Sequence, residues 1–222
     1  MLKPYEAKLQ NIKDEISKIG VDVIHSLELS LRALEDKKID SLKNIEITEK
    51  KLQVKSNEID NMILTTLALY SPEAKDLRQL VSYLKITNEL VRTGSNAKNF
   101  SKMFKKSYSD DLNTNMILEY TIPLLRSALL SLQTSISIID ETNPNHIEEK
   151  YHRVIVEESK TDDLYLMIEK NILKLISKNL DLSKEYFDIL SALRRLEKIA
   201  DRAVSISNLL HFAQVGGDMV QS

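Results

Sequence analysis

The stretch IKDEISKIGVDVIHSLELSLRAL, residues 12–34, is typical of one long amphipathic helix. Its apolar residues recur every three or four positions and would form a single stripe along one side of that helix. The stripe consists of Ile12, Ile16, Ile19, Val23, Leu27, Leu31 and Leu34. Similar spacing continues along most of the chain, so we expect a protein built from α-helices alone.

The composition supports long helices and excludes several functional classes. The 222 residues include only four glycines and four prolines, so few tight turns are available and the helices must be long. The absence of cysteine excludes disulfides, thiolate metal sites and cysteine nucleophiles. A formal net charge of -2 gives no positive excess for binding nucleic acid. No signal peptide or membrane span is recognisable, and we expect a cytoplasmic location.

Breaks in the periodicity divide the rest of the chain into five further helices. We expect them at residues 39–69, 73–106, 115–139, 146–178 and 183–212. Ser71 is the expected N-cap of the third helix, with Pro72 at its first position. Asn145 and Glu148 have the spacing of a capping box for the fifth helix. Pro123 predicts either a kink or a later start for the fourth.

The order of helices and turns occurs twice, which indicates an internal duplication. Helices two and five also align at a constant offset, so that Leu42 matches Tyr151 and Ile63 matches Ile172. We therefore predict an all-α fold of two tandem three-helix repeats that form a pseudo-twofold bundle. The repeats would span residues 1–106 and 115–214, with a linker at 107–114 and a flexible tail at 215–222.

Four acidic residues in the second repeat form two pairs with i, i+4 spacing. Glu158 and Asp162 lie on the fifth helix, and Glu197 and Asp201 lie on the sixth. Because this spacing turns only about 40° around a helix, both carboxylates of a pair point from one face. Four basic residues within Leu193–Arg202 offer a simpler interpretation, in which these carboxylates form ordinary surface ion pairs.

The position of the turn places the two acidic pairs at the same height. The midpoint of positions 158 and 201 is 179.5, as is that of 162 and 197, and this point falls in the predicted turn. Equal rise along antiparallel helices therefore puts Glu158 level with Asp201 and Asp162 level with Glu197. Oxygen ligands of this kind suit a hard divalent or trivalent cation. The equivalent residues of the first repeat, Glu49, Gln53, Val91 and Ser95, retain a single carboxylate.

Several of these segments resemble the PhoU family of regulators of phosphate uptake. Residues 196–203, LEKIADRA, are similar to the family's L-E-R-I-G-D-H-A, and residues 76–86, DLRQLVSYLKI, to its D-L-R-x-I-V-x-x-L-K-I. Residues 158–165 are similar to its acidic motif, D/E-xxx-D/N. The chain departs from the family at Ala200, where the family has glycine, and at Arg202, where it has histidine. An arginine beside a cation site lowers the site's affinity for cations.

The resemblance implies both a function and a metal site. The family's metal-binding residues carry over to Glu158, Asp162, Glu197 and Asp201, which would hold a metal ion of the iron, zinc or magnesium type. Family members are non-enzymatic cytoplasmic adaptors that contact a phosphate ABC transporter and a membrane sensor kinase, and homodimers are common among them. We carry three alternatives: a metal-binding bundle, a regulator of a different transporter, and an enzyme with a carboxylate-bridged metal pair.

Two weaker patterns have simple structural interpretations. Glu149 and His152 form a single E-x-x-H motif, whereas ferritin-like di-iron bundles need two such motifs and two further glutamates. We expect no di-iron site of that kind. Lys98, Lys102, Lys105 and Lys106 form a basic stripe. The stripe could contact acidic lipids in a peripheral membrane association, or an acidic patch on a transporter, but we favour a solvated helix face as its explanation.

Overall fold

The computed structural model contains six long α-helices and two short 3-10 helices, and it describes residues 3–45 and 49–216. The long helices are α1 (Lys3–Glu35), α2 (Glu49–Tyr70), α3 (Ala74–Ser107), α4 (Thr114–Ile136), α5 (Pro144–Ile176) and α6 (Ser183–Gln214). The short ones are η1 (Ile39–Asn44) and η2 (Leu180–Leu182). No strand occurs in the described ranges, which confirms the prediction of an all-α fold.

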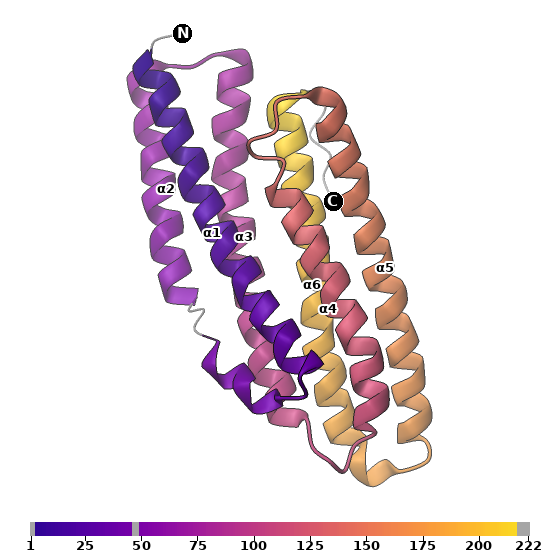
Figure 1. Cartoon of the computed structure of the whole chain (residues 1–222). Coiled ribbons are helices and arrows are strands. Elements are labelled where there is room, and N and C mark those ends of the chain that lie inside the picture. Colours follow the sequence, from indigo (N-terminus) through magenta and orange to yellow (C-terminus); the bar gives the residue numbers. More distant parts are fainter. Residues whose placement is uncertain (1–2, 46–48, 217–222) are drawn as a thin grey trace.

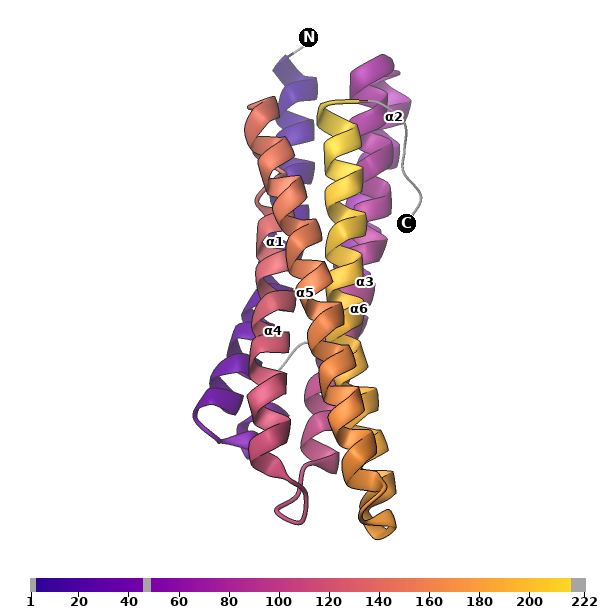
Figure 2. The same ribbon diagram turned by 90° about the vertical axis from the view of Figure 1, so that its right-hand side faces the viewer.

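The helices form two three-helix repeats that pack side by side (Figure 1). The repeats meet mainly through α3 against α6, and also through α1 against α4. Helix α2 packs on α1 and α3 at one flank, and α5 packs on α4 and α6 at the other. A view turned by 90° shows that the helices run nearly parallel along one long axis (Figure 2). Helix α5 therefore lies on an outer flank of the molecule, whereas α6 packs between α5 and α3.

The predicted apolar stripe of the first helix lies in the core. Its residues from Ile12 to Leu27 and Leu34 are fully buried, and Leu31 is half-buried. Gly20 lies on the same stripe, against α4. A Cβ atom at Gly20 would lie 3.0 Å from Cδ1 and from Cγ1 of Ile136, closer than ordinary van der Waals contact. The missing side chain thus allows α1 to approach α4 closely.

The predicted helix over residues 39–69 is wrong at its start. Residues Ile39–Asn44 form the 3-10 helix η1, and α2 begins only at Glu49. Ile45 has extended backbone angles (φ -76, ψ 102), which end the first segment. Leu42 is only 2% exposed and belongs to the core. Burial of Leu42 fixes this tight turn, although the segment has no proline or glycine to signal a break.

Two predicted helix caps are also wrong. Ser71 has a positive φ of 43°, and its amide donates to the carbonyl of Leu67, so it ends α2 in the left-handed conformation common at helix C-termini. The N-cap of α3 is Glu73. Helix α5 starts earlier than predicted because Pro144 occupies its first turn and Asn143 is its N-cap. Helix α4 starts at Thr114 and includes Pro123, which excludes the later start.

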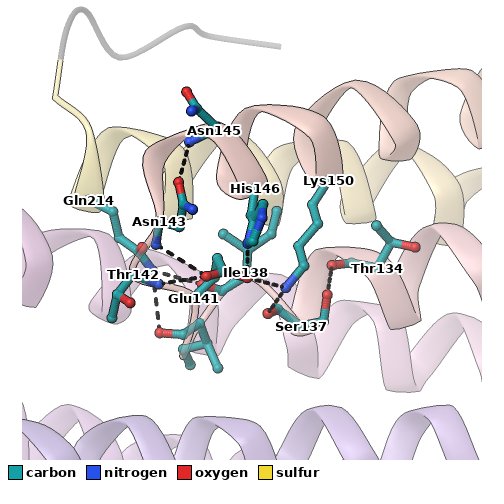
Figure 3. Close-up of polar contacts among 11 residues, drawn as sticks. Thr134, Ser137, Ile138, Glu141, Thr142, Asn143, Asn145, His146, Lys150 and Gln214 are labelled. Carbon is teal, nitrogen blue, oxygen red and sulfur yellow. Dashed lines mark hydrogen bonds and ion pairs between the residues drawn. The ribbon is translucent and has the colours of Figure 1, made fainter.

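The turn between α4 and α5 is held by the carboxylate of Glu141 (Figure 3). It accepts hydrogen bonds from the backbone amides of Thr142 and Asn143 and from Nζ of Lys150, at 3.0–3.1 Å. Lys150 also donates to the carbonyl of Ser137. Hydrogen bonds to its charged form lower the pKa of Glu141 to about 2. The end of α6 closes the same turn, since Gln214 donates to the carbonyls of Ile138 and Ile139.

Candidate functional site

The acidic residues of α5 and α6 face one another across an open groove of about 540 Å³, here called the acidic groove. Its lining residues are Glu158, Asp162, Glu197, Lys198, Asp201, Arg202 and Ser205. Ligand oxygens of Glu158, Asp162 and Asp201 all lie within 4.8 Å of one another. The structure thus brings Glu158 and Asp201 together across the hairpin, as equal distance from the turn predicts.

Glu197 lies beside this group and is partly engaged by basic side chains. Its carboxylate is 3.6 Å from Nε of Arg194 and 3.6 Å from Nζ of Lys198. The side chain is 13% exposed, and its Oε2 atom is buried without a hydrogen bond. Three of the four predicted carboxylates therefore converge, while the fourth lies at the edge of the group.

Lys198 supplies a positive charge inside the acidic groove. Its Nζ lies 2.7 Å from Oδ2 of Asp201 and donates a hydrogen bond to it. The ordinary ion-pair interpretation of the sequence is therefore correct for Asp201. A cation that binds Asp201 through Oδ2 must compete with this ammonium group. The i, i+3 spacing of Lys198 and Asp201 on α6 explains why this member of the basic group forms the pair.

Three carboxyl groups of the groove hold their protons more tightly than usual. Burial raises the pKa of Glu158, and the charges of neighbouring acidic residues, Asp162 foremost, raise it further. Burial also raises the pKa of Asp162 and of Glu197, and the charge of Asp201 adds to both shifts. Lys198 acts in the opposite direction on both groups. The negative charges are thus only partly compensated by the protein itself.

These residues fit a bound metal ion. Carboxylate oxygens that lie within 4.8 Å of one another can share one hard cation or two neighbouring ones. One carboxylate oxygen, Oδ1 of Asp162, is buried without a hydrogen-bond partner. A cation would satisfy that oxygen and relieve the repulsion that raises the pKa values. The chemistry of the donors, oxygen alone, favours a hard ion of the magnesium or iron(III) type over a soft one.

The equivalent positions of the first repeat do not form such a group. Gln53 is exposed and its amide donates to Asn57, whereas Val91 is buried at 7% exposure. Glu49, in the first turn of α2, is exposed. Both repeats have the same order of long helices, although the first has η1 and the shorter α2 where the second has the single helix α5. At these equivalent positions, the converging carboxylates are found in the second repeat.

Comparisons with known proteins agree with this duplicated architecture. The family model described as "PhoU domain" matches the chain twice, at residues 16–104 and 124–210. The chain belongs to the PhoU family. One PhoU relative, from Xylella fastidiosa strain 9a5c, is 24% identical over 99% of this chain and 90% of its own length. The PhoU protein of Escherichia coli K12 is 23% identical over 96% of this chain and 89% of its own length. Both relatives are named as accessory proteins of a phosphate-specific transport system, with the Xylella protein called a PhoU homolog.

Solved PhoU structures have the same fold. The crystal structure of PhoU from Pseudomonas aeruginosa matches with a TM-score of 0.81, covering 96% of this chain and 100% of that chain at 18% identity. PhoU from Streptococcus pneumoniae, described as a phosphate transport system regulatory protein, gives a TM-score of 0.79 over 98% of this chain and 100% of that chain, also at 18% identity. The low identities make this chain a divergent member of the PhoU family.

Among the described residues, no helix is both long and apolar enough to cross a bilayer. In the predicted basic stripe, Lys98, Lys102 and Lys106 are exposed, and Lys105 pairs with Asp40 at 3.3 Å. The stripe is therefore a charged and largely solvated face of α3.

Proposed function

We propose that this PhoU-family protein is a cytoplasmic regulator of phosphate uptake and not an enzyme. It would act by contact with a phosphate ABC transporter and a sensor kinase, as a homodimer. The observation that carries this proposal is the match of the PhoU domain to both repeats. The names of its relatives, which connect them to phosphate-specific transport, point to the same process.

The flanks of the molecule offer surfaces for such contacts. Large apolar side chains are exposed on both outer helices, including Leu64 on α2 at 54% and Leu173 on α5 at 48%. Apolar side chains become evidence for an interface where they gather in a contiguous patch, so these two positions serve as probes of each flank. Regulation by protein contact through these surfaces would require no catalytic residue in this chain.

Co-purification tests the proposal directly. Membranes from cells grown at low and at high phosphate are solubilised, and the tagged full-length chain is recovered with its bound proteins. We expect a phosphate transporter and a sensor kinase among them, in amounts that depend on phosphate. Leu64→Asp and Leu173→Asp form a matched pair that locates the contact on one flank or the other. Recovery of neither class of partner, or recovery of a different transporter, would refute the proposal.

A second proposal concerns the acidic groove. We propose that Glu158, Asp162, Glu197 and Asp201 hold a divalent or trivalent cation, which adds positive charge to that of the basic residues in the groove lining. The convergence of three carboxylates within 4.8 Å supports this site. Metal analysis of the purified chain, with the Glu197→Ala/Asp201→Ala variant as control, tests it. An equal metal content in both proteins would exclude the site.

The same variant separates regulation from metal binding. If partner recovery is unchanged in the metal-free variant, the adaptor role does not depend on the cation. If recovery is lost together with the metal, the cation is part of the regulatory surface. Either result distinguishes a regulator from a bundle whose purpose is to hold metal.

A further inference from the structure

The α5–α6 hairpin carries a second cluster of metal-ligating side chains near the start of α5. Nε2 of His152 lies 3.0 Å from Oε1 of Glu148, and Nε2 of His211 lies 2.8 Å from Oε2 of the same residue. One carboxylate of α5 therefore contacts two imidazoles, one from its own helix and one from α6. These three residues are here called the His–Glu–His cluster.

We propose that the His–Glu–His cluster binds a divalent transition-metal ion of the zinc class. Neutral imidazole nitrogens and a carboxylate oxygen are the ligands that Zn²⁺ takes at sites with three protein ligands, where water fills the fourth position. The donor set is mixed nitrogen and oxygen, unlike the oxygen-only acidic groove, so the two sites would select different metals. This inference is independent of the proposed regulatory function.

The helical framework places the three ligands on one side of the hairpin. Glu148 and His152 are four residues apart on α5 and therefore lie on the same face. His211 reaches them from the last turn of α6. Tyr151 packs against both imidazoles, with ring centroids 5.7 Å from His152 and 5.2 Å from His211. The contact with Tyr151 keeps the less exposed His211 ring beside the carboxylate.

Among the described residues, no basic side chain competes with a metal ion for the carboxylate of Glu148. In the described part of the chain, neither a lysine nor an arginine lies within ion-pair distance of Glu148, and its partners are the two histidines. The acidic groove differs, because Lys198 already pairs with Asp201 there. A metal ion at the His–Glu–His cluster displaces only protons from the imidazole nitrogens, which is the usual exchange at a histidine site.

One side chain must move for all three ligands to reach a common ion. The two imidazoles contact different oxygens of Glu148, so His152 has to turn toward His211. The side chain of His152 is 67% exposed and free to do so, whereas His211 is 26% exposed and held against Tyr151. A bound ion would then connect α5 to α6 near the open end of their hairpin.

A cobalt titration tests this site, because Co²⁺ replaces Zn²⁺ and gives visible absorption bands in tetrahedral coordination. The full-length protein with Glu197→Gln and Asp201→Asn serves as background, so that binding at the acidic groove does not interfere. We expect one Co²⁺ per chain, displaced by Zn²⁺ and not by excess Mg²⁺. His152→Asn and His211→Asn should each weaken binding by at least about tenfold and abolish the tetrahedral bands.

His25 provides the matched control. It also faces a glutamate, Glu28 at 3.8 Å, but has no second histidine beside it. His25→Asn should leave the Co²⁺ affinity unchanged. The proposal is overturned if the background protein binds no Co²⁺, if both His152→Asn and His211→Asn bind as tightly as the background, or if His25→Asn weakens binding equally. Circular dichroism of each variant confirms that the helices remain folded, and the exposed position 152 reports on the site independently of the half-buried position 211.

Discussion

Nη1 of Arg202 on α6 lies 2.7 Å from Oε2 of Glu89 on α3, so an ion pair joins the two repeats at the rim of the acidic groove. The side chains are 24% and 19% exposed. The guanidinium group is therefore held by a carboxylate of the first repeat. The sequence suggests that Arg202 weakens a cation site, and its pairing with Glu89 offsets part of that effect.

Loss of this ion pair should destabilise the fold. We expect Glu89→Gln and Arg202→Met each to lower the free energy of unfolding by about 1–2 kcal/mol, because a charge-assisted hydrogen bond between α3 and α6 is lost. The double variant should be little worse than either single one, since both remove the same interaction. Urea unfolding of the four proteins measures the coupling. Strictly additive effects would show that the two residues act independently.

Removal of Lys198 should strengthen cation binding in the acidic groove. A partly exposed ion pair of this type is worth at most about 1 kcal/mol, which corresponds to a roughly fivefold higher affinity for Lys198→Met. Isothermal titration with Mg²⁺ or Fe³⁺ measures the change. Lys160→Met is the control, because Lys160 pairs with Glu157 instead of the groove residues. Equal effects of the two substitutions would show that only overall charge matters.

Cation binding at the groove should weaken in mild acid. The pKa values of Glu158, Asp162 and Glu197 are raised, chiefly by burial, so protons compete with the cation at a higher pH than for free carboxylates. As the pH is lowered from neutral, the affinity should therefore begin to decrease before the pH reaches 4.5, the ordinary pKa of glutamate. A titration of affinity against pH checks this. A pH dependence no different from that of carboxyl groups with ordinary pKa values would contradict it.

Ionisation of these three carboxyl groups favours cation binding, but it should lower the stability of the metal-free chain. A carboxyl whose pKa is raised on folding binds its proton more tightly in the folded state, so it destabilises the fold when ionised. Replacing Glu158, Asp162 and Glu197 by Gln, Asn and Gln should therefore raise stability at neutral pH. The gain should shrink as pH falls through the raised pKa values. Thermal unfolding of both proteins from neutral pH to pH 4.5 tests the sign.

The pKa of Glu141 is shifted in the opposite direction, so this carboxylate should stabilise the fold. Its pKa is lowered from 4.5 to about 2, so its hydrogen bonds stabilise the folded state above pH 4.5, and this contribution is lost as pH falls toward 2. Glu141→Gln should lower the melting temperature at pH 7, and the difference from the native chain should shrink in that acid range. Glu149→Gln, an exposed neighbour on α5, serves as control. A difference that is independent of pH would exclude the charge of Glu141 as the cause.

The helical spacing of apolar residues predicted most of the fold, because the residues that recur at this spacing are those that the core buries. The stripe from Ile12 to Leu34 lies in the core, and the register of Glu158 against Asp201 follows from their equal distance from the turn. The start of α2 could not be predicted in this way, since burial of Leu42 overrides a sequence without turn signals. Partners such as Glu148 with His211 depend on how α5 and α6 rotate about their axes, which spacing alone does not fix.

The converging carboxylates lie in one repeat, so the two flanks of an almost symmetric molecule differ in charge. Helices α2 and α5 occupy corresponding flanks, but among the described residues it is α5 that borders the acidic groove, whose charge depends on protonation and, by our proposal, on a bound cation. A partner that contacts both flanks would thus meet one flank of constant charge and one flank whose charge depends on pH and on bound cations. The duplicated fold thus has two similar flanks, and the converging carboxylates on one of them would let a partner distinguish the two orientations of the molecule.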